Sequence, residues 1–137
     1  MTLLVPDCGE VALMTDMLGN GNNWTLKLFK NDQTPGESDV AGDYTEADFT
    51  DYAAKTLTRS VGASTWGTPA TVAGTTSSEY NSGTPQSWTC GASGNTIYGY
   101  FVVDASTGTL IYAERFSSAR TLTNGDTLTL TPKLELA

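Results

Sequence analysis

The segment from residue 95 to residue 116, NTIYGYFVVDASTGTLIYAERF, predicts two strands joined by a turn at residues 105–108. The first strand is apolar on both faces, with Ile97, Phe101 and Val103 on one side and Tyr98, Tyr100 and Val102 on the other. A strand with one face in water alternates apolar and polar residues, so this strand is expected to be covered on both faces. The cover is either the same chain, with the N-terminal helix as one candidate, or a partner subunit.

Residues 7–19 predict a short α-helix. Its apolar residues recur at helical spacing: Val11, Leu13, Met14, Met17 and Leu18. Asp7 and Glu10 fit the D-x-x-E form of a capping box, and Gly19 is expected to end the helix. Gly9 weakens a helix this short, which is therefore expected to depend on packing.

The other strands are expected to be short and separated by turns. They are predicted at residues 24–30, 53–61, 70–73, 78–80, 86–90 and 127–136. In the last of them the leucines at 128, 130, 134 and 136 are expected to face inward. Pro132 cannot donate a ladder hydrogen bond, so this strand lies at an edge or breaks there.

This succession of strands indicates an all-β fold, an antiparallel β-sandwich or jelly roll with a short N-terminal helix. The length of 137 residues suits one domain, residues 1–137, with an N-terminal arm and helix over about residues 1–19. Apolar residues make up 39% of the chain and charged residues 16%, and Thr, Ser and Gly take their place. This composition is typical of β-rich proteins with many turns.

The segment from residue 31 to residue 51 is polar and acidic and predicts a long exposed loop, with a helical turn starting at Thr45. Five of its carboxylates cluster along this loop: Asp39, Asp43, Glu46, Asp48 and Asp51. Two of them could form a glycosidase pair, or several could bind Ca²⁺. Acids in one loop lack the separate environments of a catalytic pair, and their spacing does not match an EF-hand. A solvated acidic loop is the simplest interpretation.

Charge and residue usage narrow the function. The net charge of −8 opposes binding to nucleic acid or to anionic membranes. The chain has no histidine, no GxSxG and no phosphate-binding loop, so we expect no enzyme, no cofactor and no metal site. Cys8 and Cys90 are expected to be separate reduced thiols. The N-terminal sequence does not resemble a secretory signal, so synthesis in a cytosol is expected.

The tryptophans leave an alternative of another class. Trp24, Trp66 and Trp88, with six tyrosines, could form a platform on which sugars stack. A carbohydrate-binding β-sandwich module is therefore a second hypothesis. Trp24 and Trp88 lie in predicted strands and suit a core, whereas Trp66 lies in a predicted loop and is expected to be exposed.

Three segments of the sequence resemble small structural proteins of tailed bacteriophages. They are LLVPDCGEVALM at residues 3–14, IYGYFVVDASTGTLIYAERFS at residues 97–117 and NGDTLTLTPKLEL at residues 124–136. The resemblance covers both ends of the chain and implies a virion protein similar to capsid cement or decoration proteins, which are β-rich and often trimeric. It implies the major capsid protein and other virion subunits as partners. A tail or fibre-adaptor protein is the alternative within the same class.

The candidate contacts with subunits or with the capsid lie in two places. They are Leu3, Leu4 and Val5 in the N-terminal arm, and Tyr98, Tyr100 and Val102 on the second face of the first hairpin strand.

Overall fold

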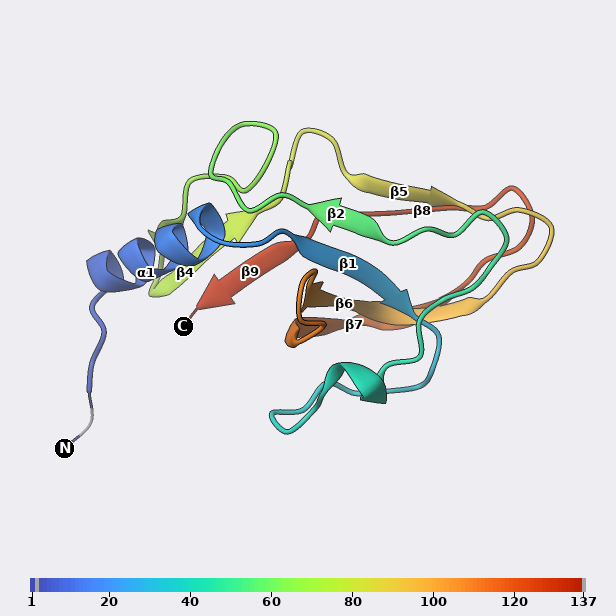
Figure 1. Ribbon diagram of the computed structural model, residues 1–137, viewed down its shortest axis with the longest axis horizontal. Helices are drawn as coiled ribbons and strands as arrows, with labels where there is room; N and C mark the ends of the chain where they lie inside the picture. Colours follow the sequence, from blue (N-terminus) through green and yellow to red (C-terminus); the bar gives the residue numbers. More distant parts are fainter. Residues whose placement is uncertain (2, 137) are drawn as a thin grey trace. The chain divides into compact units, whose positions relative to one another are not determined.

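The computed structural model describes residue 1 and residues 3–136, and is mostly β-structure in antiparallel sheets, with one α-helix among these residues (Figure 1). The chain divides into two compact units. The helix unit consists of residues 1–21, 58–86 and 130 onward, and the sheet unit of residues 22–57 and 87–129. The chain therefore passes several times from one unit to the other. That residues 1–137 form a single domain stays a prediction.

The helix unit combines α1, Asp7–Gly19, with a sheet of three antiparallel strands. The strands are β3, Ala70–Val72, β4, Thr75–Glu79, and β9, Lys133–Leu136, in the order β3-β4-β9. The helix contacts β4 and β3, and buries Met14 and Leu18 completely. This packing supplies the support that a short helix with an internal glycine requires.

The start of α1 lies where the sequence predicts it, but the predicted capping box is wrong. The N-cap residue is Pro6, and no side chain caps the helix there. Asp7 already lies inside the helix, where its charge suits the positive end of the helix dipole. Glu10 instead accepts a hydrogen bond of 2.8 Å from the Thr76 hydroxyl on β4. A tertiary contact has thus replaced the local one.

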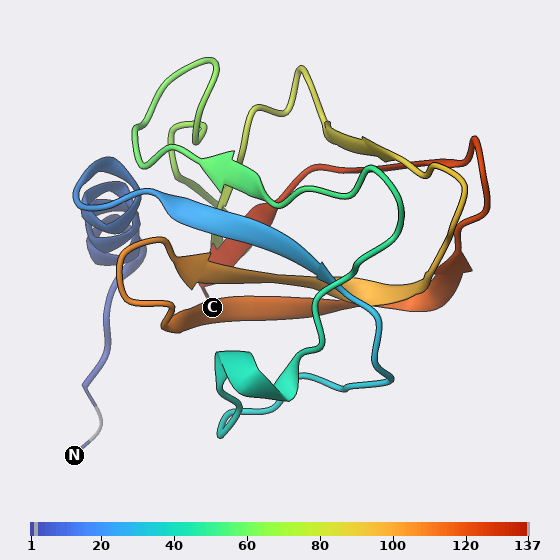
Figure 2. The ribbon, with the colours of Figure 1, turned by 45° about the vertical axis from the view of Figure 1, so that its right-hand side comes forward.

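The sheet unit contains two sheets. The larger has the antiparallel order β2-β1-β6-β7, with strands β2, Lys55–Leu57, β1, Trp24–Phe29, β6, Thr96–Asp104, and β7, Leu110–Thr121. The smaller pairs β5, Gln86–Thr89, with β8, Thr127–Leu130, each of which reaches one residue into the helix unit. A 3₁₀ helix, η1, spans Ala41–Asp43. Within this unit the β5–β8 pair and the η1 segment lie on opposite sides of the larger sheet (Figures 1 and 2).

The first face of β6 is covered by residues around η1. Phe101 and Val103 form a buried cluster with Phe29 and Tyr44, and the Tyr44 and Phe101 rings stack with their centroids 5.2 Å apart. Gly99 makes room for this cluster, because a Cβ atom there would lie 2.7 Å from the Phe29 ring and 2.1 Å from the carbonyl oxygen of Glu114. Any larger residue at position 99 would therefore displace the backbone of β7.

The second face of β6 is also covered by the chain itself. Val102 is fully buried, Tyr100 is 3% exposed, and both share this face with Leu26 and Leu28 of β1. The Tyr100 ring also contacts the rings of Tyr112 and Phe116 on β7. Both faces of β6 are thus apolar because β6 is a central strand of the larger sheet and the chain itself buries both of its faces. The N-terminal helix packs on β3 and β4 instead.

The acidic segment from residue 31 to residue 51 is not a simple exposed loop. Tyr44, Ala47 and Phe49 are each buried to at least 95%. Backbone hydrogen bonds join Lys30 to Thr45 and Ala47 to Leu28. Its one helical turn is η1, and the turn predicted at Thr45 does not form. The apolar residues hold the segment on β1 and β6, while most of its carboxylates remain at the surface.

The strands lie near their predicted positions, but several of them end at other residues than the sequence predicts. The strand predicted at residues 53–61 is reduced to β2, Lys55–Leu57. The predicted final strand breaks at Pro132 into β8 and β9, which belong to different sheets. Leu128 is buried as predicted, whereas Leu130, Leu134 and Leu136 are only half-buried.

The turn of the β6–β7 hairpin depends on an ionised carboxylate. Asp104 accepts hydrogen bonds from the Ser106 hydroxyl at 2.6 Å and from the backbone N–H groups of Ser106 and Thr107 at 2.8 and 3.0 Å. The Ser106 hydroxyl, followed by these N–H groups, lowers the pKa of Asp104 below its ordinary value. Gly108, with φ of 72°, completes the turn in the left-handed region.

We expect acid to destabilise the protein partly through this turn. A carboxyl group with a lowered folded pKa stabilises the fold above its unfolded pKa of about 3.9, and loses that effect as the pH falls through the folded pKa. The melting temperature should therefore fall between pH 7 and about pH 3, and it should fall less for Asp104→Asn, which cannot be protonated. Melting curves by circular dichroism at several pH values test this. Equal acid dependence of the two proteins would contradict it.

Candidate functional site

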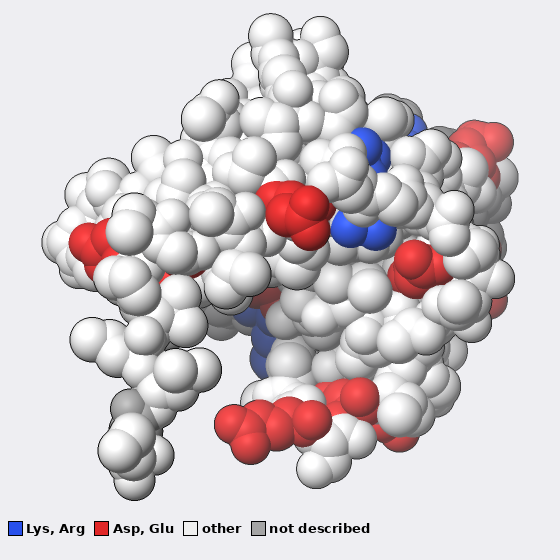
Figure 3. Space-filling model, turned by 60° about the vertical axis from the view of Figure 1, so that its left-hand side comes forward, with Lys and Arg blue, Asp and Glu red and all other residues white. Residues whose placement is uncertain are grey.

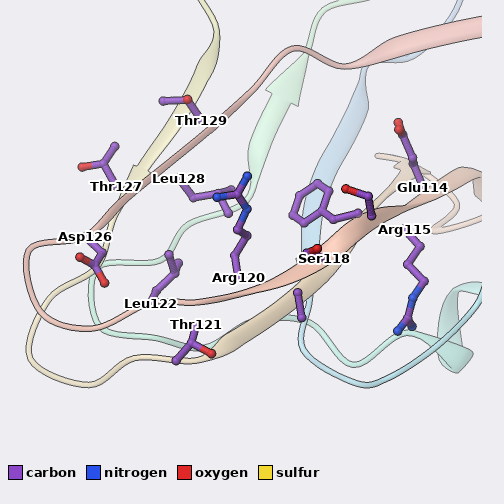
Figure 4. Close-up of a pocket in the computed structure, with 13 residues that line it drawn as sticks. Glu114, Arg115, Ser118, Arg120, Thr121, Leu122, Asp126, Thr127, Leu128 and Thr129 are labelled. Atoms are coloured by element: carbon purple, nitrogen blue, oxygen red, sulfur yellow. The ribbon is translucent and has the colours of Figure 1, made fainter.

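A groove lies along the outer edge of the larger sheet, between β7 and β8 (Figure 4). Its volume is about 870 Å³. One wall is formed by residues 114–122, at the end of β7 and just beyond it, and the other by residues 126–129, at the start of β8. Among the described residues, β7 pairs only with β6 and β8 only with β5. The edges of two strands therefore border the groove, each with backbone groups that no second strand pairs.

A long bulge widens β7 at this groove. Gly99 of β6 pairs with Arg115 and Ile97 pairs with Arg120, so that residues 116–119 oppose Tyr98 alone. Within the bulge Phe116 is half-buried, whereas Ser117, Ser118 and Ala119 are exposed. Bulges bend a strand and re-aim its side chains, and they are common at sheet edges and functional sites.

The lining of the groove is mostly polar, and only two of the residues that line it are buried. Leu122 and Leu128 are each 6% exposed. Four charged side chains line the rim, Glu114, Arg115, Arg120 and Asp126. Three of them have partners in the protein: Glu114 accepts a hydrogen bond from Tyr100, Arg115 forms an ion pair with Asp32, and Asp126 accepts hydrogen bonds from Thr123. The bonds from the Thr123 N–H and hydroxyl lower the pKa of Asp126, which is therefore ionised at neutral pH.

Arg120 differs from the other cations. The structure describes all seven Lys and Arg side chains, and six of them have an ion pair, a hydrogen bond or a ring contact. The guanidinium of Arg120 has none to any described residue, and its side chain is exposed. Figure 4 shows it extending from β7 toward Leu128 of β8. The groove therefore contains one cation that no described residue pairs, on a protein whose net charge is −8.

The N-terminal arm is the most exposed apolar segment of the described residues. Leu3 is 90% exposed and Leu4 84%. Val5 is 37% exposed and lies against the first turn of α1, where a Cβ atom at Gly9 would approach it to 3.1 Å. Leu13, farther along α1, is 59% exposed. The helix unit thus leaves these apolar side chains in water.

The other predicted contact residues are placed differently, and two of them need correction. Tyr98 is half-buried against the cluster of Phe29 and Phe101, with the Arg115 guanidinium 5.3 Å from its ring centroid. Tyr100 and Val102 are buried by the chain itself and are not accessible to a partner. The apolar second face that suggested an interface is covered by the chain itself.

The β7 groove was not predicted from the sequence. Glu114 and Arg115 are the only charged residues in the hairpin from residue 95 to residue 116 other than Asp104, and Arg115 forms an ion pair with Asp32 of the same chain. The following residues, SSAR at 117–120, interrupt the apolar pattern and are the local sign of the bulge. The sequence does not indicate that β7 is an edge strand, because strand order depends on pairing between distant segments.

The tryptophans are all in the interior. Trp24, Trp66 and Trp88 are exposed by 3% or less. The Trp88 indole N–H donates a hydrogen bond of 2.8 Å to the carbonyl oxygen of Ala53. The exposed position expected for Trp66 is therefore wrong, and its ring packs against Tyr80 instead. The sugar-stacking platform loses the side chains on which it rested.

Three other expectations concern thiols, metals and membranes. Cys8 and Cys90 are both free, as predicted, with Cys8 exposed and Cys90 buried. Within residue 1 and residues 3–136, no three His, Cys, Asp or Glu side chains lie close enough together to hold a metal ion. No helix in the same part of the chain is long and apolar enough to span a bilayer.

Comparison with known proteins gives no relative. The chain matches no protein-family model, no curated protein sequence and no solved structure. The likeness to phage structural proteins therefore rests on the three sequence segments described above.

Proposed function

We propose that this protein is a non-enzymatic structural protein of a tailed-bacteriophage virion, a capsid cement or decoration protein that binds the assembled capsid and stabilises it. It would be made in the host cytoplasm and reside in the virion. Its partners would be the major capsid protein and other virion subunits, and it would act as a homo-oligomer, with a trimer favoured. We further propose that the layers of the sheet unit form a β-sandwich or jelly roll.

The exposed N-terminal arm is the observation that carries this proposal. Leu3 and Leu4 are 90% and 84% exposed. Full burial of a leucine side chain contributes about 1.5–3 kcal/mol, so a partner that covers both would gain about 3–6 kcal/mol. Most large apolar side chains of the protein are buried in its core, whereas those of the arm are exposed. An exposed apolar arm of this kind is suited to attach to another protein surface. A protein that binds only the assembled capsid stabilises that state by mass action.

Surface charge supports a protein partner as well. On the face drawn in Figure 3, acidic groups gather along the lower edge and stand singly elsewhere, with a few basic groups and wide uncharged areas between them. Four of the seven cations form ion pairs with carboxylates of the same chain, which reduces the positive charge available for phosphates. Uncharged surface of this kind suits a protein interface, which needs only about 800 Å² per partner.

A tail or fibre-adaptor protein is the alternative within the same class, and it would attach through the same kind of apolar contact at another place in the virion. The carbohydrate-binding alternative no longer has a specific observation in its favour, because the three tryptophans are buried.

The test of the capsid proposal is co-sedimentation of the purified protein with capsids that lack it. Saturable binding supports the capsid proposal, and a protein that stays in the supernatant at all concentrations contradicts it.

A further inference from the structure

We propose that the N-terminal arm of a second copy of this chain binds in the β7 groove as an added β-strand. The inference concerns self-association and does not depend on the capsid proposal. It rests on two features of the described residues. The apolar arm is exposed, and the groove is bordered by two strand edges that pair with no further strand.

The backbone of the groove is suited to a strand. The outer edge of β7 and the free edge of β8 have no further strand partner among the described residues. Such edges pair readily with an extended segment, whose main-chain hydrogen bonds give affinity and whose alternate side chains enter pockets. Five or six residues of strand span about 17–20 Å. The wall at residues 114–122 is long enough to pair with an arm that ends at Pro6.

The arm would bind chiefly through its backbone. The described arm residues before Pro6 are Met1, Leu3, Leu4 and Val5, all apolar and all exposed. The lining of the groove is mostly polar, and its larger apolar residues are the half-buried Phe116 and the buried Leu122 and Leu128. One or two arm side chains would contact these residues, while the main-chain hydrogen bonds of the added strand would supply most of the affinity.

Charge favours the same occupant. Two copies with a net charge of −8 repel each other over most of their surfaces. The described residues of the arm carry no acidic side chain, so the arm can approach the groove with less repulsion than the acidic parts of the surface. Asp7, which follows the arm, is exposed and has no hydrogen bond or ion pair with another described residue. Its carboxylate is a suitable partner for the free Arg120 guanidinium.

An arm-to-groove contact is heterologous, because different surfaces of the two copies meet. Such contacts produce closed rings when the rotation between copies closes and filaments when it does not. A closed ring of three would agree with the trimer proposed above. In every ring each arm is covered and each groove is filled, so the capsid would be bound by other surfaces of the linked copies.

Cross-linking between differently marked copies tests the inference. Both copies carry Cys8→Ser, because Cys8 is exposed whereas Cys90 is buried. One copy carries Leu4→Cys and the other, of larger mass, carries Ser118→Cys at the exposed centre of the bulge. A short bismaleimide should join them into mixed dimers. The control replaces Ser118→Cys by Val72→Cys, which is 74% exposed and outside the groove. We expect at least tenfold more mixed dimer with Ser118→Cys.

The role of Arg120 gives a second measurement in the same assay. Arg120→Glu should reduce the mixed dimer at least fivefold, whereas Arg120→Lys, which keeps the charge, should retain most of it. A yield no higher than that of the Val72→Cys control would overturn the inference. A chain that carries both Leu4→Cys and Ser118→Cys gives a further check. If this variant cross-links only within single chains, the inference is overturned, because the arm then fills the groove of its own chain.

Discussion

Replacement of Tyr100 by aspartate is expected to unfold the protein rather than only to separate its subunits. Tyr100 is 3% exposed, and its ring contacts Tyr112 and Phe116 while its hydroxyl donates to Glu114. Loss of a buried aromatic ring costs about 3–5 kcal/mol. An aspartate would add an unpaired buried charge close to Glu114, which costs several kcal/mol more. The total approaches the free energy of unfolding of a typical domain, about 5–15 kcal/mol.

The matched control is Tyr100→Phe, which keeps the ring and removes only the hydroxyl. It should lower the free energy of unfolding by about 1.5–3 kcal/mol, the usual effect of one lost hydrogen bond to a charged group. Urea unfolding followed by circular dichroism measures both variants. A folded Tyr100→Asp protein with normal stability would show that the second face of β6 is not buried as described.

Deletion of residues 1–5 should have the opposite effect to Tyr100→Asp: the protein should stay folded but lose its ability to assemble. Leu3 and Leu4 are almost fully exposed, so their removal should change the free energy of unfolding by less than about 0.5 kcal/mol. Self-association should be lost, and with it the gain from several linked binding sites, which can raise apparent affinity by about 10²–10⁴. Attachment to capsids should therefore weaken at least tenfold.

The control for the deletion is the double variant Leu3→Ser and Leu4→Ser, which keeps the length of the arm and its backbone. It should weaken assembly by less than the deletion, because the added strand would keep its main-chain hydrogen bonds. Sedimentation velocity gives the oligomeric state, and co-sedimentation gives capsid occupancy. Unchanged oligomers and occupancy after the deletion would remove the arm from both roles.

Elements with strong local patterns could be predicted from the sequence. The helix at Asp7–Gly19, the hairpin of β6 and β7 and the break at Pro132 all lie where the pattern indicates. Errors arose where a distant contact outweighs a local preference. Glu10 binds Thr76 rather than capping the helix, and Tyr44 draws an acidic segment onto β6.

The candidate site could be predicted only in part. The exposed arm could be predicted from the sequence. Its apolar residues precede Pro6 and the helix, and they fit neither the helical nor the strand spacing of apolar residues. The opposite error occurred for Tyr100 and Val102, whose apolar face is covered by the chain's own second layer. The edge position of β7 and the isolation of Arg120 follow from strand order and from the partners of the other cations. Neither property is encoded near these residues in the sequence.

The most direct test of the capsid proposal is the amount of full-length protein that sediments with capsids lacking it, measured as its concentration rises. The proposal predicts a plateau at a fixed number of copies per capsid subunit, as a lattice of equivalent sites requires. It also predicts that the capsids at the plateau resist heating better than bare capsids. Absence of a plateau, or a plateau with only a few copies per particle, would contradict a cement or decoration role and would favour attachment to the tail.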